Sequence, residues 1–174
     1  MIAFQNAVWA AILSPHRMNE TYAHNADATQ GQAFDLPIAD RRIGGRYRLV
    51  ELLRKERTAE FFRAEDPQTG KTVVVGCWKL SNFSAGARKR IEREAAILSI
   101  SQSPHLAGLL EIGEDGGVLY IVRPYIPGIT LRHRLRRGPL KLHDALTVGR
   151  SLFSALIELH SRGLLHHDVR PANL

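Results

Sequence analysis

Cysteine, aromatic side chains and long apolar runs are all scarce in this chain of 174 residues, which has one cysteine and 7% aromatic residues. Because Cys77 has no second cysteine to pair with, an internal disulfide is excluded and a reducing cytoplasm is the simplest expectation. No run of residues is long and apolar enough to span a membrane. Residues 1–13 are fairly apolar but lack the basic leader and the small-residue cleavage site of a signal peptide. These absences favour a globular cytoplasmic protein.

Charge, in contrast, is plentiful, and basic residues outnumber acidic ones. Lys and Arg number 24 against 17 Asp and Glu, and the resulting net charge of +7 weakly favours anionic partners. Basic residues gather at 88–93 and 132–137, on two predicted helices with charges spread around the axis. Because no aromatic residues are interleaved with them for base stacking, we expect solvated helix faces and no nucleic-acid partner.

The first part of the chain carries little regular pattern. Residues 4–12 place a few apolar side chains at helical spacing, but a loosely docked terminus is the favoured interpretation. Residues 14–40 are polar and irregular, which is typical of a linker. We therefore expect residues 1–42 to form a flexible N-terminal extension.

Periodicity beyond residue 43 predicts a mixture of strands and helices. Alternating and β-branched residues predict strands, and turn chemistry at 66–70 and 114–117 predicts two hairpins. The expected strands are 47–53, 60–64, 72–78, 109–113 and 118–122, and the expected helices are 84–99, 130–137 and 143–162. The apolar face expected along the longest helix consists of Ala145, Gly149, Leu152, Leu156 and Leu159.

Five local patterns follow one another in an order that is informative as a set. They are YRLVELL at 47–53, RAEDPQTGKT at 63–72, REAAIL at 93–98, SPHL at 103–106 and LHSRGLLHHD at 159–168. They resemble the first strand, the next hairpin, the first helix, the turn after that helix and the catalytic loop of protein kinases. In particular, they resemble bacterial serine/threonine kinases of the eukaryotic-like type.

The resemblance implies an α+β fold of the protein kinase kind. It predicts an N-lobe at 43–122, made of a five-stranded antiparallel sheet plus one helix. A hinge at 123–128 would follow. Residues 129–174 would then form the first helices of a C-lobe and end at the catalytic loop.

The catalytic loop is the best preserved of the resembling segments. By resemblance, Asp168 accepts the proton of the attacking hydroxyl, and Asn173 holds a magnesium ion against the nucleotide phosphates. Arg170 replaces a Lys that faces the transferring phosphate, so the charge survives with a different geometry. His167 replaces the usual Arg, which grips a phosphorylated activation segment, and a His would do this only when protonated. The implied cofactors are ATP and Mg²⁺, and the implied partner is a protein substrate or a partner domain.

The phosphate loop departs from the family pattern. The family has G-x-G-x-x-G, whose bare backbone wraps the nucleotide phosphates. Here Arg54, Glu56 and Ala59 take the three glycine positions, which makes positive φ costly there. Arg54, Lys55 and Arg57 could attract phosphate, but an ordinary solvated hairpin tip is the favoured interpretation.

The lysine that orients the nucleotide phosphates is also missing. Gly76 occupies its position in the third expected strand, and Lys79 is the nearest substitute. Because strand side chains alternate, Lys79 faces the cleft only if a bulge intervenes, and Gly76 could host one. By resemblance Glu94 pairs with that lysine; without a cation there, Glu94 is expected to pair locally with Arg90.

The adenine pocket looks altered as well. Phe61 and Val74 take positions that the family gives to Val and Ala, and overfilling such a slot expels the ligand. Arg123 falls at the gatekeeper position and Pro124 at the first hinge position, where it offers no donor. The residues that the resemblance assigns to nucleotide binding are Leu53, Val74, Lys79, Glu94, Tyr125 and Ile126.

The chain stops before the metal-binding D-F-G and the rest of the large lobe. We therefore expect an incomplete magnesium site and a long helix whose apolar faces lack partners. A fragment, a shortened gene product and the front of a larger multidomain protein all fit. The leading hypothesis is an ATP-dependent Ser/Thr kinase domain that is inactive as this chain; the alternative is a pseudokinase that acts as a binding or scaffold module.

Overall fold

The computed structural model describes residues 41–101 and 103–174, so the expectations for residues 1–40 lie outside the described residues. The described chain forms two compact units. The sheet unit consists of residues 41–95 and Leu109–Tyr125, and the helical unit consists of Ala96–Gly108 and Ile126–Leu174.

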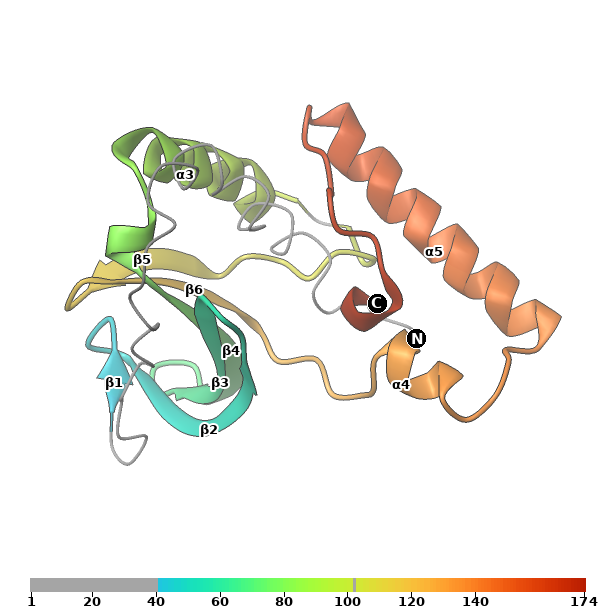
Figure 1. The fold of residues 1–174 in the computed structure, drawn as a ribbon, viewed down its shortest axis with the longest axis horizontal. Helices are drawn as coiled ribbons and strands as arrows, with labels where there is room; N and C mark the ends of the chain where they lie inside the picture. Colours follow the sequence, from blue (N-terminus) through green and yellow to red (C-terminus); the bar gives the residue numbers. More distant parts are fainter. Residues whose placement is uncertain (1–40, 102) are drawn as a thin grey trace, which may run out of the picture. The chain divides into compact units, whose positions relative to one another are not determined.

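The sheet unit is built on one antiparallel sheet. Its strands are β1 (Arg42–Ile43), β2 (Tyr47–Lys55), β3 (Ala59–Asp66), β4 (Lys71–Lys79), β5 (Glu111–Asp115) and β6 (Val118–Pro124). Their spatial order is β1-β2-β3-β4-β6-β5 (Figure 1). The five predicted strands are confirmed, and the two-residue β1 adds a short sixth strand that sequence periodicity could not detect.

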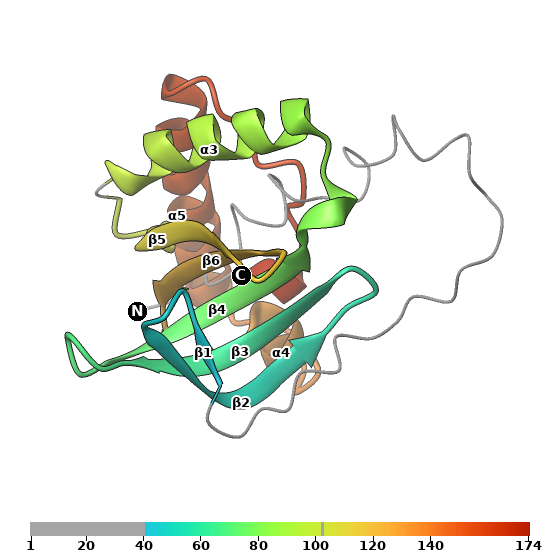
Figure 2. The ribbon, with the colours of Figure 1, turned by 90° about the vertical axis from the view of Figure 1, so that its left-hand side faces the viewer.

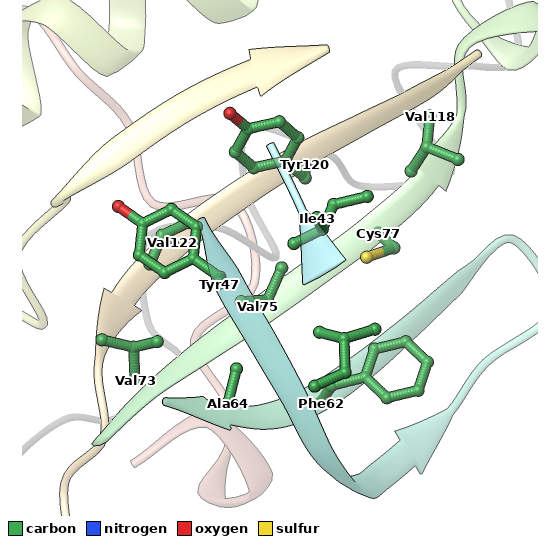
Figure 3. Packing of buried hydrophobic residues seen from close by; sticks show 11 residues of the cluster. Ile43, Tyr47, Phe62, Ala64, Val73, Val75, Cys77, Val118, Tyr120 and Val122 are labelled. Carbon is green, nitrogen blue, oxygen red and sulfur yellow. The ribbon is translucent and has the colours of Figure 1, made fainter. Parts of the chain in front are cut away.

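The sheet is strongly curled, and residues from strands at its opposite edges are therefore in contact. The Gly44 amide, in the turn after β1, donates to Asp115 Oδ2 at the end of β5 at 2.8 Å. Tyr47 Oη of β2 donates to Glu111 Oε2 of β5 at 2.6 Å. Figure 3 shows the apolar side chains that converge inside this curl. The cluster consists of Ile43, Tyr47, Leu49, Phe62, Ala64, Val73, Val75, Cys77, Val118, Tyr120 and Val122.

A polar network closes the curl where its edges approach. Glu111 accepts from the hydroxyls of Tyr47 at 2.6 Å and Tyr120 at 2.8 Å. Arg46 makes a bidentate ion pair with Asp66, at 2.7 and 2.6 Å. The hydrogen bonds from Arg46 hold the pKa of the Asp66 carboxyl well below its usual range. Burial, with the hydrogen bond to Glu111, raises the pKa of Tyr120 to about 12.

The turn between β5 and β6 contains only Gly116 and Gly117, with φ of 55° and 78°. Asp115 pairs with Val118 on either side of it. Two consecutive residues with positive φ are what a type I′ hairpin turn requires, and glycine adopts them without steric cost. The predicted hairpin is confirmed, although β5 begins two residues later than the expected 109.

Helix α3 (Ala85–Ser99) follows a short 3₁₀ turn at Leu80–Asn82. Ser84 caps it, since its Oγ accepts from the Ala87 amide at 3.2 Å. Ile91 and Ala95 are buried on one face, as predicted. Arg88 lies 3.4 Å from Glu114, which links α3 to β5, and the helix lies along that strand in Figure 2.

The helical unit contains α4 (Leu131–Leu135) and α5 (Leu142–Ser161). Thr130 caps α4 by accepting from the His133 amide at 3.2 Å. In α5 the buried residues are Val148, Ala155 and Leu159, so the predicted face was wrong in including Ala145, which is exposed. Apolar residues nearly surround α5, and a period of 3.6 therefore does not select one face.

Much of the apolar surface of α5 is solvent-exposed. Phe153 and Ile157 are 65% and 68% exposed. Of the helices that the structure describes, none combines the length and the apolar character that crossing a bilayer requires.

Candidate functional site

The catalytic-loop residues Asp168 and Asn173 lie in direct contact within the helical unit. The Asn173 amide nitrogen, Nδ2, donates to Asp168 Oδ2 at 2.8 Å and to the Asp168 backbone carbonyl at 3.0 Å. The 3₁₀ turn η3 (Pro171–Asn173) makes this contact possible, because it turns the chain so that Asn173 meets Asp168, five residues earlier. The predicted pair is therefore assembled by local geometry, with Pro171 fixing φ at the start of the turn.

The orientation of the Asn173 side chain is determined by its partners. Both atoms that it faces on Asp168 are oxygens, so the amide nitrogen must point at them. The carbonyl oxygen, Oδ1, is buried and has no hydrogen-bond partner among the described residues. A buried oxygen of this kind is a ligand type that Mg²⁺ accepts, so Asn173 fits the metal-binding role implied by the resemblance.

A complete cation site is not formed by the described residues. No group of three or more His, Cys, Asp or Glu side chains that could hold a metal ion occurs at 41–101 or 103–174. The Asn173 oxygen would therefore supply one ligand, and the others would have to come from the nucleotide, from water or from residues outside the described ranges.

Arg170 extends the same cluster. Its Nε lies 3.1 Å from Asp168 Oδ2, the oxygen that Asn173 also contacts. The side chain of Arg170 remains 53% exposed. A guanidinium at this place keeps positive charge next to Asp168, while its planar fork differs from the compact ammonium of a Lys.

The two histidines before Asp168 differ sharply. His166 is buried, and burial lowers the pKa of its imidazole, so the neutral form is favoured. Its Nδ1 accepts from the Asp168 amide at 3.2 Å, which helps to orient the loop. His167 has φ of 55°, and no other non-glycine residue in the described ranges has positive φ. A left-handed backbone at a non-glycine residue is typical of functional loops.

The end of the loop is anchored to α4. The Leu131 amide donates to the Leu174 carbonyl at 2.7 Å, and Leu174 is buried. Because this bond satisfies an amide in the first turn of α4, it ties the catalytic loop to a regular element.

The phosphate-loop segment in the sheet unit is a closed hairpin tip. The Glu56 amide donates to the Ala59 carbonyl at 2.8 Å. Arg54 pairs with Glu56 at 3.0 Å, and Lys55 pairs with the buried Glu60 at 2.9 Å. These pairs direct the Arg54 and Lys55 charges to neighbouring carboxylates, as expected for an ordinary hairpin. None of the three substituted glycine positions has positive φ.

The space beside Gly76 is filled by aromatic rings. Phe61 is its cross-strand partner in β3, and Trp78 lies two residues on, on the same face of β4. A Cβ added to Gly76 would lie 2.5 Å from Trp78 Cη2 and 3.1 Å from Phe61 Cε1. The two rings pack edge to face, with centroids 5.5 Å apart. The structure therefore leaves no room for a lysine at position 76 unless Trp78 moves.

Lys79 does not replace the missing lysine by way of a bulge. Strand β4 pairs in unbroken register with β3 and β6 from Val73 to Trp78, and Lys79 continues it opposite Val118. Because this ladder contains no bulge, an offset of three places Lys79 on the face opposite to Gly76, as we expected in the absence of a bulge. Glu94 lies 4.0 Å from Arg90, in agreement with the local pair that we expected.

Two arginines flank the Phe61 ring on the same face of the sheet. Arg54 lies 4.3 Å and Arg123 lies 5.9 Å from the ring centroid, measured from the guanidinium carbon. Val74 pairs with Arg123 and is also buried. Burial, with a smaller contribution from the charge of Arg54, lowers the pKa of Arg123 to about 10. The guanidinium is therefore still charged at neutral pH.

The remaining residues predicted to bind nucleotide are Leu53, Tyr125 and Ile126. Leu53 is 42% exposed and falls where the pairing of β2 with β3 shifts register. The Tyr125 amide donates to the Thr72 carbonyl at 3.3 Å. Tyr125 is the last residue of the sheet unit, and Ile126 is the first residue of the second segment of the helical unit.

Sequence reasoning missed Trp78, although a signal existed. Trp78 stands two residues after Gly76, so strand alternation puts both on one face. A glycine inside a strand often marks a place that another group approaches closely. Alternation alone could therefore have indicated which side chain fills the lysine position.

The chain is similar to known proteins in sequence and in fold. Residues 47–174 match the protein kinase domain family. The chain is 27% identical to the serine/threonine-protein kinase PrkC of Bacillus subtilis, over 79% of this chain and 22% of PrkC. It is 33% identical to the serine/threonine-protein kinase PknE of Mycobacterium tuberculosis, over 75% of this chain and 23% of PknE.

A solved structure is similar as well. The crystal structure of the Mycobacterium tuberculosis PknI kinase domain superposes with a TM-score of 0.63 and 26% sequence identity, covering 84% of this chain and 56% of that one. The chain therefore spans less than a quarter of the length of PrkC and PknE and about half of the PknI domain. With the family match over 47–174, the catalytic-loop cluster and the curled sheet followed by helices, the chain belongs to the protein kinase domain family.

Proposed function

We propose that this chain is a serine/threonine-type protein kinase domain that does not bind nucleotide as it stands and acts as a binding or scaffold module. The observation that carries the proposal is the contact of Trp78 with Gly76, where the family has its phosphate-orienting lysine. Phe61, Val74 and Arg123 fill the neighbouring positions on the same face, and all three are buried. Large buried side chains at positions that line the purine slot in the family overfill that slot and disfavour a purine.

A second candidate function, phosphoryl transfer from ATP to Ser or Thr, is favoured by the catalytic loop. The Asp168–Asn173 contact and the adjacent Arg170 guanidinium supply a proton acceptor, a metal-ligand oxygen and a positive charge. ATP would contribute the phosphoryl group, and its magnesium ion would add a positive charge to that of Arg170. Asp168 would accept the proton of the substrate hydroxyl, and Arg170 would face the phosphate.

Thermal unfolding with and without magnesium-ATP distinguishes the two candidates. A ligand at ten times its dissociation constant stabilises the folded state by about 1.4 kcal/mol, which raises Tm by about 3–6 °C for a chain of this size. We expect no rise at 5 mM magnesium-ATP. A rise of that size, abolished by Asn173→Ala, would overturn the binding-module proposal in favour of the kinase.

The proposed setting of the domain follows from length and composition. Because PrkC and PknE are about four times longer than the matched region, we propose that the domain works within a larger multidomain protein, with a protein partner. A cytoplasmic location is proposed from the lone Cys77, whose pKa is raised by burial to about 12 and which is therefore an unreactive thiol.

A further inference from the structure

A segment of the helical unit carries positive charge without any balancing carboxylate. We define the basic patch as Arg132, Arg134, Arg136, Arg137 and Lys141, on and just after α4. No Asp or Glu occurs from residue 116 to residue 143. All members of the basic patch except Arg134 are exposed. Positive charge therefore accumulates locally on the surface of this unit.

Carboxylates neutralise several cations in the described ranges, but none in the basic patch. In the sheet unit, Arg46 and Arg63 pair with carboxylates at 2.6 and 2.8 Å, and in the helical unit Arg162 does so at 2.8 Å. Within the ranges that the structure describes, no ion pair involves the basic patch, and Arg134 donates to the Gly138 carbonyl at 3.2 Å. Arg132 and Arg136 are four residues apart, where like charges destabilise a helix. An external anionic partner would relieve that repulsion.

The same segment also exposes apolar side chains. Ile129, Leu135 and Leu142 are 50%, 40% and 76% exposed, and they alternate along the chain with the cations. No Phe, Tyr or Trp occurs from residue 126 to residue 152, so the stacking platform of a single-stranded nucleic-acid site is missing. The partner that matches this mixture has an extended surface that carries negative charge, with an apolar layer just beneath that charge.

We propose that the basic patch docks the domain on a membrane surface that contains anionic lipids. Arg and Lys side chains interact with the anionic head groups, and Leu135 and Leu142 enter the boundary between head groups and acyl chains. The interaction is peripheral and reversible. No member of the basic patch is among the residues assigned to nucleotide binding or to catalysis.

Co-sedimentation of the 174-residue chain with vesicles tests this proposal. The probes are vesicles of phosphatidylcholine alone and vesicles with 30% phosphatidylglycerol, at 50 and 300 mM salt. We expect binding only to the anionic vesicles, and weaker binding at the higher salt because the Debye length shortens. Arg136→Gln/Arg137→Gln should weaken the partition coefficient about 25-fold, since each cation near such a surface contributes about a fivefold factor.

The matched control is Lys71→Gln/Lys89→Gln, which removes the same charge from exposed positions in the sheet unit. We expect this control to bind nearly as well as the unmodified chain. Equal losses in the two double variants would overturn the proposal, because net charge alone would then explain binding. Tighter binding to polyuridylate than to anionic vesicles, lost in Arg136→Gln/Arg137→Gln, would also overturn it and assign the basic patch to RNA. Circular dichroism of each variant checks that the fold is retained.

Discussion

Trp78 takes the space that a side chain on Gly76 would occupy, with 2.5 Å between its Cη2 and a Cβ placed on Gly76. A lysine at position 76 and the present ring of Trp78 would therefore compete for the same space. Replacing Gly76 by Lys would not rebuild a phosphate-orienting cation, because Trp78 is itself buried against Phe61. A reversal would require both positions to change together.

Gly76→Ala tests this packing directly. We expect it to lower the free energy of unfolding by about 1–3 kcal/mol, because the added methyl group overpacks a filled site. Trp78→Leu should remove most of the penalty of Gly76→Ala when the two are combined, which urea unfolding of the four variants can measure as a coupling energy.

Gly149→Ala is the matched control for that experiment. Gly149 lies in α5, and a Cβ added there meets no atom within 4 Å. We expect this substitution to raise stability by about 0.5–1 kcal/mol, because alanine is the better helix former. Similar effects at both glycines would contradict the account of the Gly76 site.

Asn173→Asp should destabilise the chain more than Asn173→Ala. Alanine removes two hydrogen bonds donated to Asp168, at an expected cost of about 1–3 kcal/mol. Aspartate adds a carboxylate where Nδ2 now lies 2.8 Å from Asp168 Oδ2, so repulsion is added to that loss. Urea unfolding at pH 8 and pH 5 checks this, because the extra cost of aspartate should shrink at the lower pH. Asn82→Asp, at a half-buried position, should change stability by less than about 0.5 kcal/mol.

Acid should weaken the sheet unit through Asp66. The pKa of this carboxyl is lowered in the folded state, chiefly by its hydrogen bonds from Arg46, so the unfolded state binds more protons at low pH. The Asp66 contribution is fully present above the ordinary Asp pKa of about 3.9 and is lost as pH falls below it. Unfolding followed from pH 6 to pH 2 should show a shallower decline in Asp66→Asn. Glu65→Gln, at the exposed pair with Arg48, should keep the original slope.

Glu111→Leu should open the polar closure of the sheet. Two hydroxyls, those of Tyr47 and Tyr120, would lose their acceptor, at a cost of about 1–3 kcal/mol for each one left unsatisfied. Combining Glu111→Leu with Tyr47→Phe and Tyr120→Phe should recover part of that loss, because no buried hydroxyl then lacks a partner. Thermal unfolding of the single and triple variants gives the comparison, and an equally unstable triple variant would contradict a hydrogen-bonding role.

Local pattern was sufficient for most of the fold. The β-branched run of β4 and the Gly116-Gly117 turn depend on neighbours in sequence, so short segments were enough to predict them. The buried face of α5 could not be predicted, because apolar residues nearly surround that helix and only its packing decides which of them are buried. The closure of the sheet by Glu111 could not be predicted from the sequence either, since Tyr47 and Glu111 are 64 residues apart in the chain.

The sequence alone determined the family resemblance, the Asp168–Asn173 pair and the loss of the strand lysine, because each depends on residue types at short, fixed spacings. The tertiary structure decided what took the place of that lysine. A register without a bulge sets Lys79 on the opposite face of β4, and the pairing of Phe61 with Gly76 brings an aromatic from another strand beside Trp78. Cross-strand register arises from the whole sheet, so no single segment of the chain encodes it.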